Sequence, residues 1–469
     1  MAEQAYKLLI GGNLVDGDST MDVINPATEA VFTQAPRASE AQLNDAVAAA
    51  KAAFPAWAAT PIDERRKVIT AIADAVEANY EDFARLLTQE QGKPLQDATG
   101  EVLGTVAFMR YFAGLDMPVK VLDDSEGRRV EAHRKPLGVI GAIVPWNFPM
   151  ILMAFKLPPA LLAGNTVVLK PAPTTPLTTL KLAGLMKDIV PAGVVNVITD
   201  ANDLGAPLTA HPDIRKVSFT GSTSTGAKVM AGAANLLKRI TLELGGNDAG
   251  IVLDDVNPKE TAPQLFQSAF QNSGQVCIAM KRLYVHESIY DEMCAELAKL
   301  AEDAIIGDGL EQGTQLGPLQ NKMQYDKVKD LIEDARKDGQ IIAGGTTPDQ
   351  KGYFIRPTIV RDISDGTRLV DEEQFGPVLP VIKYSDPEDA VARANASPYG
   401  LGGSVWSKDT DRAYALADKM DAGTIWVNKH AELDPMIPFG GSKMSGVGTE
   451  LGADGLEEFT QLKIINMAR

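Results

Sequence analysis

The sequence contains two cysteines, Cys277 and Cys294, in different surroundings. Cys277 follows residues 271–276, QNSGQV, a polar turn with a glycine in which a ligand could reach the thiol. Backbone N–H dipoles in such a turn favour the thiolate, which is the nucleophilic form. Cys294 lies on the apolar stripe of a helix predicted over 289–304, a pattern typical of a packing cysteine. Lone cysteines are more often structural than reactive, so Cys277 is at this point only a candidate nucleophile.

Two other polar side chains stand in apolar surroundings. Glu243 ends a predicted strand, just before two glycines. A carboxyl group in an apolar cleft has a raised pKa and can act as a general base near neutral pH; alternatively it pairs with a nearby Lys or Arg. Asn147 lies in PWNFP, residues 145–149. Its amide either caps local backbone or donates a hydrogen bond to a developing oxyanion.

A turn rich in glycine and hydroxyl groups runs from Gly221 to Lys228, GSTSTGAK. It fails as a P-loop because the lysine comes one place late and Val229 replaces the metal-binding Ser or Thr. The turn could bind a phosphate at a helix N-terminus, or it could be an ordinary βα turn with a Ser cap. The zinc motif His-Glu-x-x-His, Cys-x-x-Cys and the hydrolase motif Gly-x-Ser-x-Gly are absent, so we expect no metal site.

These residues fall among alternating strands and helices. We predict strands over 138–144, 166–170, 194–199, 216–220, 240–244 and 249–253, and helices over 150–163, 176–189, 203–210 and 222–236. Such alternation predicts a parallel sheet that is covered on both faces and binds ligands at the carboxyl ends of its strands. Towards the N-terminus, a capping box at Ser39 and the pair Thr60-Pro61 predict two helices, the second running to about Gln91. A second α/β region follows, over about 258–442.

Size and composition limit the function classes. The 469 residues correspond to two to four domains at roughly 100–200 residues each. A net charge of −17 argues against nucleic acids and anionic membrane surfaces as partners. Two cysteines cannot build a disulfide framework, which favours a reducing compartment and a cytoplasmic location. Residues 1–16 lack the apolar run of a signal peptide. Prolines interrupt the uncharged segment 137–155, which argues against a membrane span.

Six sequence blocks together resemble the signature motifs of the NAD(P)-dependent aldehyde dehydrogenase superfamily, in its hydrolytic branch. They appear in the family's order and spacing across nearly the whole chain. The blocks are PWNFP (145–149), FTGS (219–222), LELGG (242–246), GQVC (274–277), EQFGP (373–377) and PFGGSKMSG (438–446).

The resemblance implies an α/β fold with three parts. These are a Rossmann-like cofactor domain over 1–116 and 136–244, an α/β catalytic domain over 245–445, and a small β oligomerisation hairpin, 117–135, joined by the C-terminal segment 446–469. Relatives of this kind are homodimers or homotetramers. In this sequence Leu462, Ile464 and Ile465 would be a liability on a free edge strand. Thr449 and Gln461 depart from an Arg and a Glu that brace the subunit interface in some relatives.

The resemblance also implies catalytic roles. Cys277 would attack the aldehyde to give a thiohemiacetal and then a thioester, while Asn147 and the Cys277 N–H hold the oxyanion. Glu243 would activate the water that releases the acid, and Glu450 would relay protons. The branch that passes the acyl group to coenzyme A usually lacks the glutamate, so Glu243 favours hydrolysis to a free carboxylate.

Further residues would hold the cofactor, expected to be NAD with NADP accepted more weakly. Their set is Trp146, Lys170, Gly221, Ser222, Glu373 and Phe375. Lys170 and Glu373 would bind the riboses, Phe375 would pack beside the nicotinamide ribose, and the others would adjoin the phosphates. Pro173 stands where many NAD-preferring relatives carry a Glu, so the preference for NAD should be weak.

The substrate is expected to be a medium-chain aliphatic or aromatic aldehyde. Its pocket would be lined by small or apolar residues: Gly104, Phe148, Leu152, Phe155, Leu433 and Phe439. Glu432 and Asp434 near the pocket mouth leave open an aminoaldehyde or semialdehyde. Two other classes also stay open: an esterase-type thiol hydrolase that uses Cys277, and a non-catalytic structural descendant. The intact set of Cys277, Glu243 and Asn147 argues against the last.

Overall fold

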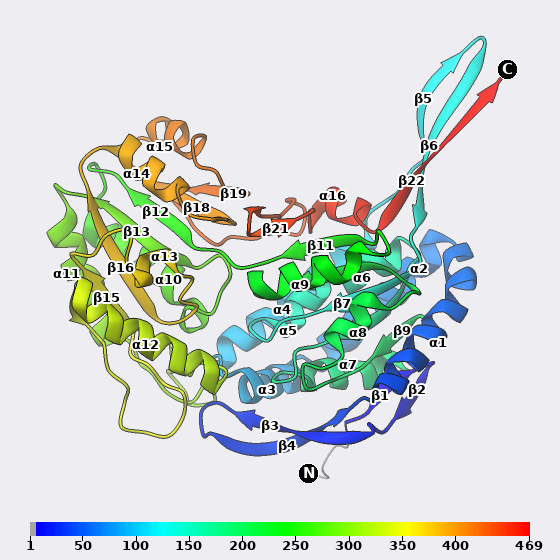
Figure 1. The fold of residues 1–469 in the computed structure, drawn as a ribbon, viewed down its shortest axis with the longest axis horizontal. Coiled ribbons are helices and arrows are strands. Elements are labelled where there is room, and N and C mark those ends of the chain that lie inside the picture. The colour runs from blue at the N-terminus through cyan, green and yellow to red at the C-terminus, as the bar shows by residue number, and fades with distance from the viewer. Residues whose placement is uncertain (1–5) are drawn as a thin grey trace.

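The computed structural model describes residues 6–469, so the first five residues of the N-terminal segment discussed above lie outside it. Two α/β bodies lie side by side, and a narrow three-stranded sheet projects from one of them (Figure 1). The predicted α/β fold class is confirmed: each body contains a mainly parallel sheet with helices on both faces. The three domain boundaries stay a prediction.

The first sheet has eight strands, and its five central strands are parallel. In spatial order they are β2 (Asn13–Val15), β1 (Leu8–Ile10), β9 (Val195–Val197), β8 (Thr166–Lys170), β7 (Val139–Ile143), β10 (Ile214–Thr220), β11 (Arg239–Glu243) and β21 (Gly446–Val447). The strand order reverses between β7 and β10. Open α/β sheets bind ligands at such a switch point, beyond the carboxyl ends of the strands. We call the carboxyl ends of β7, β8, β9, β10 and β11, together with the loops that follow them, the carboxyl edge.

Helices α6 (Leu157–Leu162) and α7 (Leu177–Met186) cover one face of this sheet, and α8 (Gly205–Ala210) and α9 (Thr223–Ala234) cover the other. The helix predicted over 150–163 is in fact two, α5 (Pro149–Ala154) and α6. Pro158 and Pro159 explain the break, because neither can donate a backbone hydrogen bond to the preceding turn.

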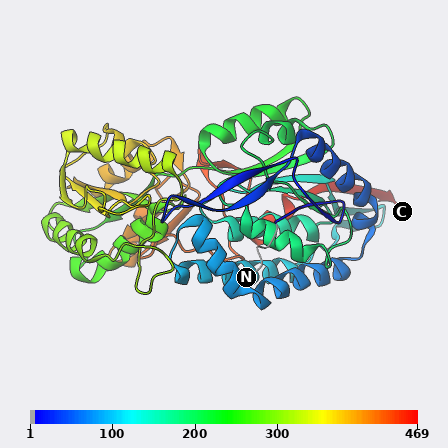
Figure 2. The same ribbon diagram turned by 90° about the horizontal axis from the view of Figure 1, so that it is seen from below.

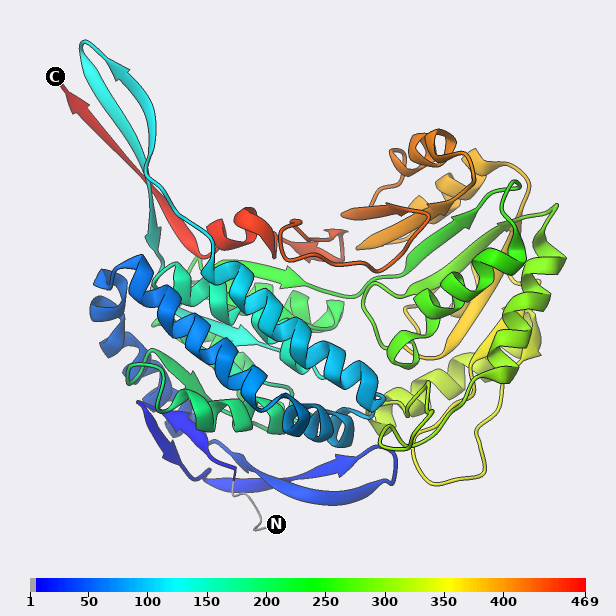
Figure 3. The same ribbon diagram turned by 180° about the vertical axis from the view of Figure 1, so that it is seen from behind.

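An outer helical layer packs over α6 and α7 (Figure 3). It contains α2 (Ile62–Ala78), α3 (Tyr80–Gln91) and α4 (Leu95–Ala113), while α1 (Glu40–Ala59) packs on β8 and β9. The capping box at Ser39 is confirmed. The prediction of one helix to Gln91 is wrong, because the chain leaves helical geometry at Asn79, whose amide donates to the Ala75 carbonyl at 2.8 Å. Thr60 does not cap α2; its hydroxyl bonds the Ala56 carbonyl instead.

The second sheet has seven strands, parallel except for β14. Their order is β14 (Gln340–Ala343), β15 (Thr358–Arg361), β16 (Val378–Tyr384), β13 (Met280–His286), β12 (Asp248–Val252), β18 (Gly402–Trp406) and β19 (Thr424–Val427). On one face lie α10 (Pro258–Phe270) and α11 (Tyr290–Asp303). On the other lie α12 (Lys322–Asp338), α13 (Arg368–Asp371), α14 (Pro387–Asn395) and α15 (Thr410–Ala417). Cys294 of α11 is fully buried in the core, as predicted for a packing cysteine.

A long hairpin of β3 (Ser19–Asn25) and β4 (Ala30–Arg37) runs along the first body, and its tip reaches the second (Figure 2). Its tip contacts the second body, where Tyr353 N–H donates to the Pro26 carbonyl at 3.0 Å. Gly352 N–H donates to the Glu29 carboxylate, also at 3.0 Å. The hairpin therefore connects the two bodies through hydrogen bonds at its tip.

The projecting sheet has the order β22 (Thr460–Ala468), β6 (Arg128–Pro136), β5 (Lys120–Ser125). Helix α16 (Gly452–Glu457) precedes β22. Leu462 and Ile464 on the edge strand β22 are 46% and 48% exposed, so the predicted liability of a free edge is present in the single chain. Within residues 6–469, no helix combines the length and apolar character needed to cross a membrane.

Candidate active site

Cys277 lies in a strained loop between α10 and β13. We call residues 271–278 the Cys277 loop. Asn272 and Ser273 have φ of 49° and 55°, and Gly274 has φ of 75°, which is the left-handed region that favours glycine. Contacts outside the loop hold this geometry, since the Asn272 amide donates to the Asn147 carbonyl at 3.1 Å and the Ser273 hydroxyl donates to the Gly317 carbonyl at 2.7 Å.

Asn147, at the carboxyl edge beyond β7, lies against this loop. Its side-chain amide donates to the Gln275 carbonyl at 3.0 Å, and it is almost fully buried. A carboxamide carries two N–H groups, and only one is needed for this bond. The two predicted roles of Asn147 are therefore compatible, because one N–H can hold backbone while the other faces a reacting group.

A buried ion pair, which the sequence did not indicate, supports Asn147 from behind. The Lys93 ammonium donates to Glu101 at 2.5 Å and to the Asn147 carbonyl at 2.9 Å, and it lies 3.6 Å from the ring centre of Phe148. The other oxygen of Glu101 accepts from the N–H of Met150 at 2.9 Å. The ion pair therefore fixes the backbone of residues 147–150, which carries Asn147.

Glu243 ends β11 and is buried on the same side as Cys277. Within residues 6–469, no hydrogen-bond donor lies close enough to either carboxylate oxygen, though the Cys277 thiol is near enough to interact with the group. Burial raises the pKa of Glu243 to about 8, and the charge of Glu450 adds to the rise. Such a carboxyl group titrates near neutral pH, as a general base requires.

The thiol of Cys277 does not behave as the turn chemistry predicted. Burial raises its pKa well above the usual value, and the nearby Glu243 and Asp248 raise it further. The expectation that the loop itself favours the thiolate is therefore wrong. Ionisation of Cys277 requires a partner that accepts the proton or a cation that stabilises the charge, and Lys281 is such a cation.

Glu450 reaches the site from the C-terminal segment. It forms a buried ion pair with Lys156, with 2.6 Å between the ammonium nitrogen and a carboxylate oxygen, and Ser218 lies beside the pair. Its second oxygen has no hydrogen-bond donor among residues 6–469. The charges of both Glu450 and Lys156 act on Glu243, so the structure brings the predicted proton relay residue next to the predicted base.

The predicted cofactor residues come from both bodies. Trp146, Lys170, Gly221 and Ser222 lie at the carboxyl edge. Glu373 and Phe375 come from the second body, and the ring of Phe375 meets that of Trp146 edge-on at 5.4 Å. These residues therefore line both sides of the junction between the bodies.

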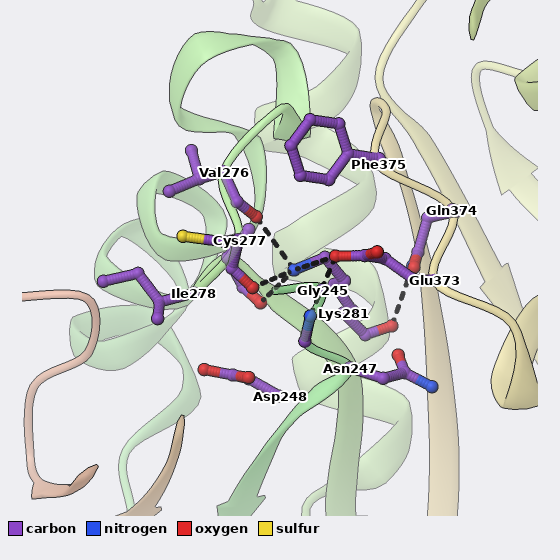
Figure 4. A network of polar contacts seen from close by, with 12 residues as sticks. Gly245, Asn247, Asp248, Val276, Cys277, Ile278, Lys281, Glu373, Gln374 and Phe375 are labelled. Atoms are coloured by element: carbon purple, nitrogen blue, oxygen red, sulfur yellow. Dashed lines mark hydrogen bonds and ion pairs between the residues drawn. The ribbon is translucent and has the colours of Figure 1, made fainter. Parts of the chain in front are cut away.

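Several of these side chains already have protein partners. Lys170 pairs with the buried Asp200 at 2.7 Å. The Ser222 hydroxyl accepts from Thr225 N–H at 3.3 Å and so caps α9, which is the ordinary role left open above. Glu373 accepts from Gly246 N–H at 3.0 Å (Figure 4).

The sequence of the whole chain matches known proteins over its length. The family model described as "Aldehyde dehydrogenase family" matches residues 14–465. The chain belongs to the aldehyde dehydrogenase family. It is 41% identical to the phenylacetaldehyde dehydrogenase of Pseudomonas fluorescens, over 99% of this chain and 96% of that protein.

Solved structures of aldehyde dehydrogenases agree with the fold. A NAD+ complex of the Bacillus cereus aldehyde dehydrogenase has a TM-score of 0.97 at 37% identity, covering 99% of this chain and 97% of that chain. A NAD+ complex of the Staphylococcus aureus betaine aldehyde dehydrogenase has a TM-score of 0.96 at 33% identity, covering 98% of this chain and 94% of that chain.

In this aldehyde dehydrogenase most of the predicted substrate residues belong to the large apolar core of the first body, or pack against it as Cys277 does. Leu152, Phe155 and Phe439 are buried in the apolar cluster against which Cys277, Phe148 and Leu433 pack. Phe155 stacks on Phe108 at 5.1 Å and so belongs to the core behind the site. A methyl group at Gly104 would lie 3.2 Å from the end of the Ile151 side chain, which would have to move slightly to admit it.

Three charged contributors to the site were not identified from sequence. Lys93, Glu101 and Lys281 are all buried, although lysine and glutamate are usually solvated. Only the position of Lys93 was a weak sign of a special role, because it lies between Gly92 and Pro94 at the start of a helix. Among residues 6–469, no cluster of His, Cys, Asp and Glu is arranged to hold a metal ion.

Proposed function

We propose that the protein oxidises an aldehyde to the carboxylic acid with NAD+, through a thioester on Cys277 that water hydrolyses. One observation carries the proposal: Glu243 and Asn147, from two different strand ends, both adjoin Cys277. A nucleophile, a base and an oxyanion donor thus occur together at one point in the fold.

In the first step the Cys277 sulfur attacks the aldehyde carbonyl carbon as its proton passes to Glu243. The oxygen that becomes negative is held by the free N–H of Asn147 and the backbone N–H of Cys277. Donors of this kind contribute about 3–4 kcal/mol each to the transition state. Because the thiol pKa is raised, proton transfer must accompany the attack.

After the oxidation the acyl group remains on Cys277 as a thioester. Glu243 first gives up the proton it took from the thiol, which passes towards the unpartnered oxygen of Glu450 and on to solvent. The Glu243 carboxylate, with its pKa raised to about 8, then takes a proton from water, and the hydroxide adds to the thioester carbonyl. This second proton returns to the sulfur once the thiolate has left. Loss of the thiolate from the tetrahedral adduct releases the acid.

The junction between the bodies is suited to a dinucleotide. At the end of β10, the buried Thr220 hydroxyl has no partner among residues 6–469, and a Cβ at Gly245 would lie 2.4 Å from Glu373. Trp146, Lys170, Gly221 and Ser222 would hold NAD+ from one side, and Glu373 and Phe375 from the other. When bound, NAD+ supplies the hydride acceptor.

The favoured substrates are medium-chain aliphatic or aromatic aldehydes. The apolar cluster around Cys277 supports this preference, as does the 41% identity to a phenylacetaldehyde dehydrogenase. Each buried methylene contributes about 0.8 kcal/mol. A cationic aminoaldehyde or a semialdehyde is the alternative. Glu432 and Asp434, which are expected near the pocket mouth, would favour such a cationic substrate.

The division into a cofactor domain, a catalytic domain and an oligomerisation element is also proposed. The exposed apolar residues on β22 support a homodimer or homotetramer in which this edge strand is covered. Both cysteines are free, which supports a reducing compartment such as the cytoplasm.

NADH formation from a panel of aldehydes tests the proposal. The panel contains the straight-chain aldehydes from C2 to C8, phenylacetaldehyde and betaine aldehyde, with product acid identified by mass. We expect kcat/KM to rise several-fold per carbon over the first few members. A flat or falling series would refute the apolar pocket, and no NADH with any aldehyde would refute the proposed reaction. Preference for betaine aldehyde would support the alternative substrate.

A further inference from the structure

Lys281, the second residue of β13, is a buried cation beside the nucleophile. Its side chain is 2% exposed. The ammonium donates to the Cys277 carbonyl at 2.6 Å and the Val276 carbonyl at 2.8 Å. Figure 4 shows these two carbonyl oxygens facing Lys281, while the sulfur of Cys277 points the other way.

The other buried lysines near the site differ from Lys281. Lys93, Lys156 and Lys170 have a carboxylate oxygen at 2.5, 2.6 and 2.7 Å, respectively. The ion pair of Lys281 is looser, with Glu373 at 3.7 Å, and its short contacts are neutral carbonyls. Burial of a charge is costly unless a close partner compensates it. Because no carboxylate among residues 6–469 lies close to Lys281, its positive charge is less neutralised than that of the other three lysines. It therefore acts more strongly on the neighbouring backbone carbonyls and on Cys277.

We propose that Lys281 is a positioning residue for the reaction, which fixes the Val276–Cys277 peptide and brings a positive charge to the thiol. The proposal depends on the nucleophilic role of Cys277 proposed above. The Val276 carbonyl and the Cys277 N–H belong to one trans peptide unit, so they point in opposite directions. An ammonium on the carbonyl side therefore holds the N–H towards the developing oxyanion, and polarises it as a donor.

The charge has a second effect. Three charged groups act on the Cys277 thiol: Glu243 from the end of β11 in the first sheet, and Asp248 and Lys281 from the starts of β12 and β13 in the second. The two carboxyl groups raise the thiol pKa and Lys281 lowers it. Without Lys281 the negative charges of Glu243 and Asp248 would not be compensated, so the thiol pKa should rise further.

The test uses the full-length protein and the variants Lys281→Met, Lys281→Arg and Lys383→Met. Lys383 is an exposed lysine on β16 and serves as the control. Alkylation of Cys277 by iodoacetamide is measured against pH by peptide mass, without aldehyde. We expect Lys281→Met to raise the midpoint pH of Cys277 alkylation by about one unit. It should also lower kcat roughly tenfold or more. Lys281→Arg should restore the midpoint, and Lys383→Met should change neither value.

A folded Lys281→Met protein with the wild-type midpoint and kcat would overturn the proposal. If this variant does not fold, Lys281→Gln replaces it, because glutamine retains N–H donors without the charge. A raised midpoint in Lys281→Gln supports the proposal and an unchanged one overturns it. Failure of the proposed function is recognised separately, since it would show as dehydrogenase activity in Cys277→Ala.

Discussion

The carboxyl edge and the Cys277 loop contribute to the same site but are built differently. At the edge, side chains follow regular parallel strands, and buried charges such as Lys170 with Asp200 are closely paired. In the loop, two consecutive non-glycine residues have positive φ, and backbone carbonyls accept hydrogen bonds from side chains outside the loop. The edge depends on local regularity, whereas the loop depends on tertiary contacts.

The difference has energetic consequences. A non-glycine residue with positive φ costs on the order of 1–3 kcal/mol, and it persists only where the surroundings enforce it. Asn272 and Ser273 are held by the Asn147 segment and by Gly317. Substitutions in the loop should therefore affect activity more than comparable substitutions at the edge.

Replacing each of the two cysteines by alanine in turn should give the largest difference in activity. Cys277→Ala should abolish dehydrogenase activity and any hydrolysis of activated esters, because both need the thiol. Cys294→Ala removes a buried sulfur from the apolar core around α11 and should keep most activity with a lowered melting temperature. NADH formation and ester hydrolysis are measured for both. An inactive Cys294→Ala beside an active Cys277→Ala would show that the nucleophile has been misassigned.

Gly274→Ala should be the next most damaging change. A Cβ at Gly274 would lie 2.3 Å from the Gly376 carbonyl oxygen, and φ there is 75°. We expect kcat to fall by about two orders of magnitude, as for loss of an oxyanion donor, and the free energy of unfolding to fall by about 1–3 kcal/mol.

The matched control is Gly184→Ala in α7, where among residues 6–469 nothing lies within 4 Å of an added Cβ. It should be neutral or slightly stabilising, because alanine favours helix more than glycine does. Equal effects of the two substitutions on activity would contradict the expected sensitivity of activity to the backbone geometry of the Cys277 loop.

Glu243→Gln tests the edge itself. The variant should form one equivalent of NADH rapidly and then turn over slowly, because deacylation loses its base. In the wild type the carboxylate form is the active base, so deacylation should rise with pH and level off above about 8, the raised pKa of Glu243. Single-turnover and steady-state rates from pH 6 to 9 are the measurement. Steady turnover near wild type would remove Glu243 from this role.

Sequence reasoning predicted the edge better than the loop. Strands with continuous apolar runs and helices with caps are local patterns, so the parallel sheet, its carboxyl ends and the capping box at Ser39 were predicted correctly. The errors in these local patterns were two helices that were predicted as continuous. They are interrupted at Asn79 and before Pro158, where a helix-breaking residue lies within a helical pattern. The six sequence blocks indicated the family, which the match to residues 14–465 shows.

The electrostatics of the site could not be predicted from the sequence. The raised thiol pKa of Cys277 arises from burial and from Glu243 and Asp248, which the fold brings together from different strands. Lys281 precedes Arg282, a pair that in sequence suggests a solvated segment, yet both side chains are buried. Burial and long-range contact are properties of the tertiary structure, so a charged residue gives no sign in the sequence of which group it will meet.

Cofactor preference is the smallest expected effect, and it arises entirely at the edge. A carboxylate that bonds both ribose hydroxyls favours NAD and repels the 2′-phosphate of NADP, and Pro173 cannot do either. Lys170 could attract that phosphate, but its charge is already paired with Asp200, whose second oxygen accepts from Leu204 N–H at 2.9 Å. We therefore expect NAD to be used better, with NADP accepted detectably.

Two substitutions should move this preference in opposite directions. Asp200→Asn leaves Lys170 without its counter-charge and should raise kcat/KM for NADP relative to NAD by roughly fivefold, about 1 kcal/mol. Pro173→Glu adds the repelling carboxylate and should depress NADP use while NAD use changes little. The ratio of kcat/KM for the two cofactors is measured in the wild type and both variants. A wild-type preference for NAD beyond roughly a thousandfold, about 4 kcal/mol, would mean that a residue other than Pro173 rejects the 2′-phosphate. In that case Pro173→Glu would have little further effect, because the repulsion it adds would already be present from another group.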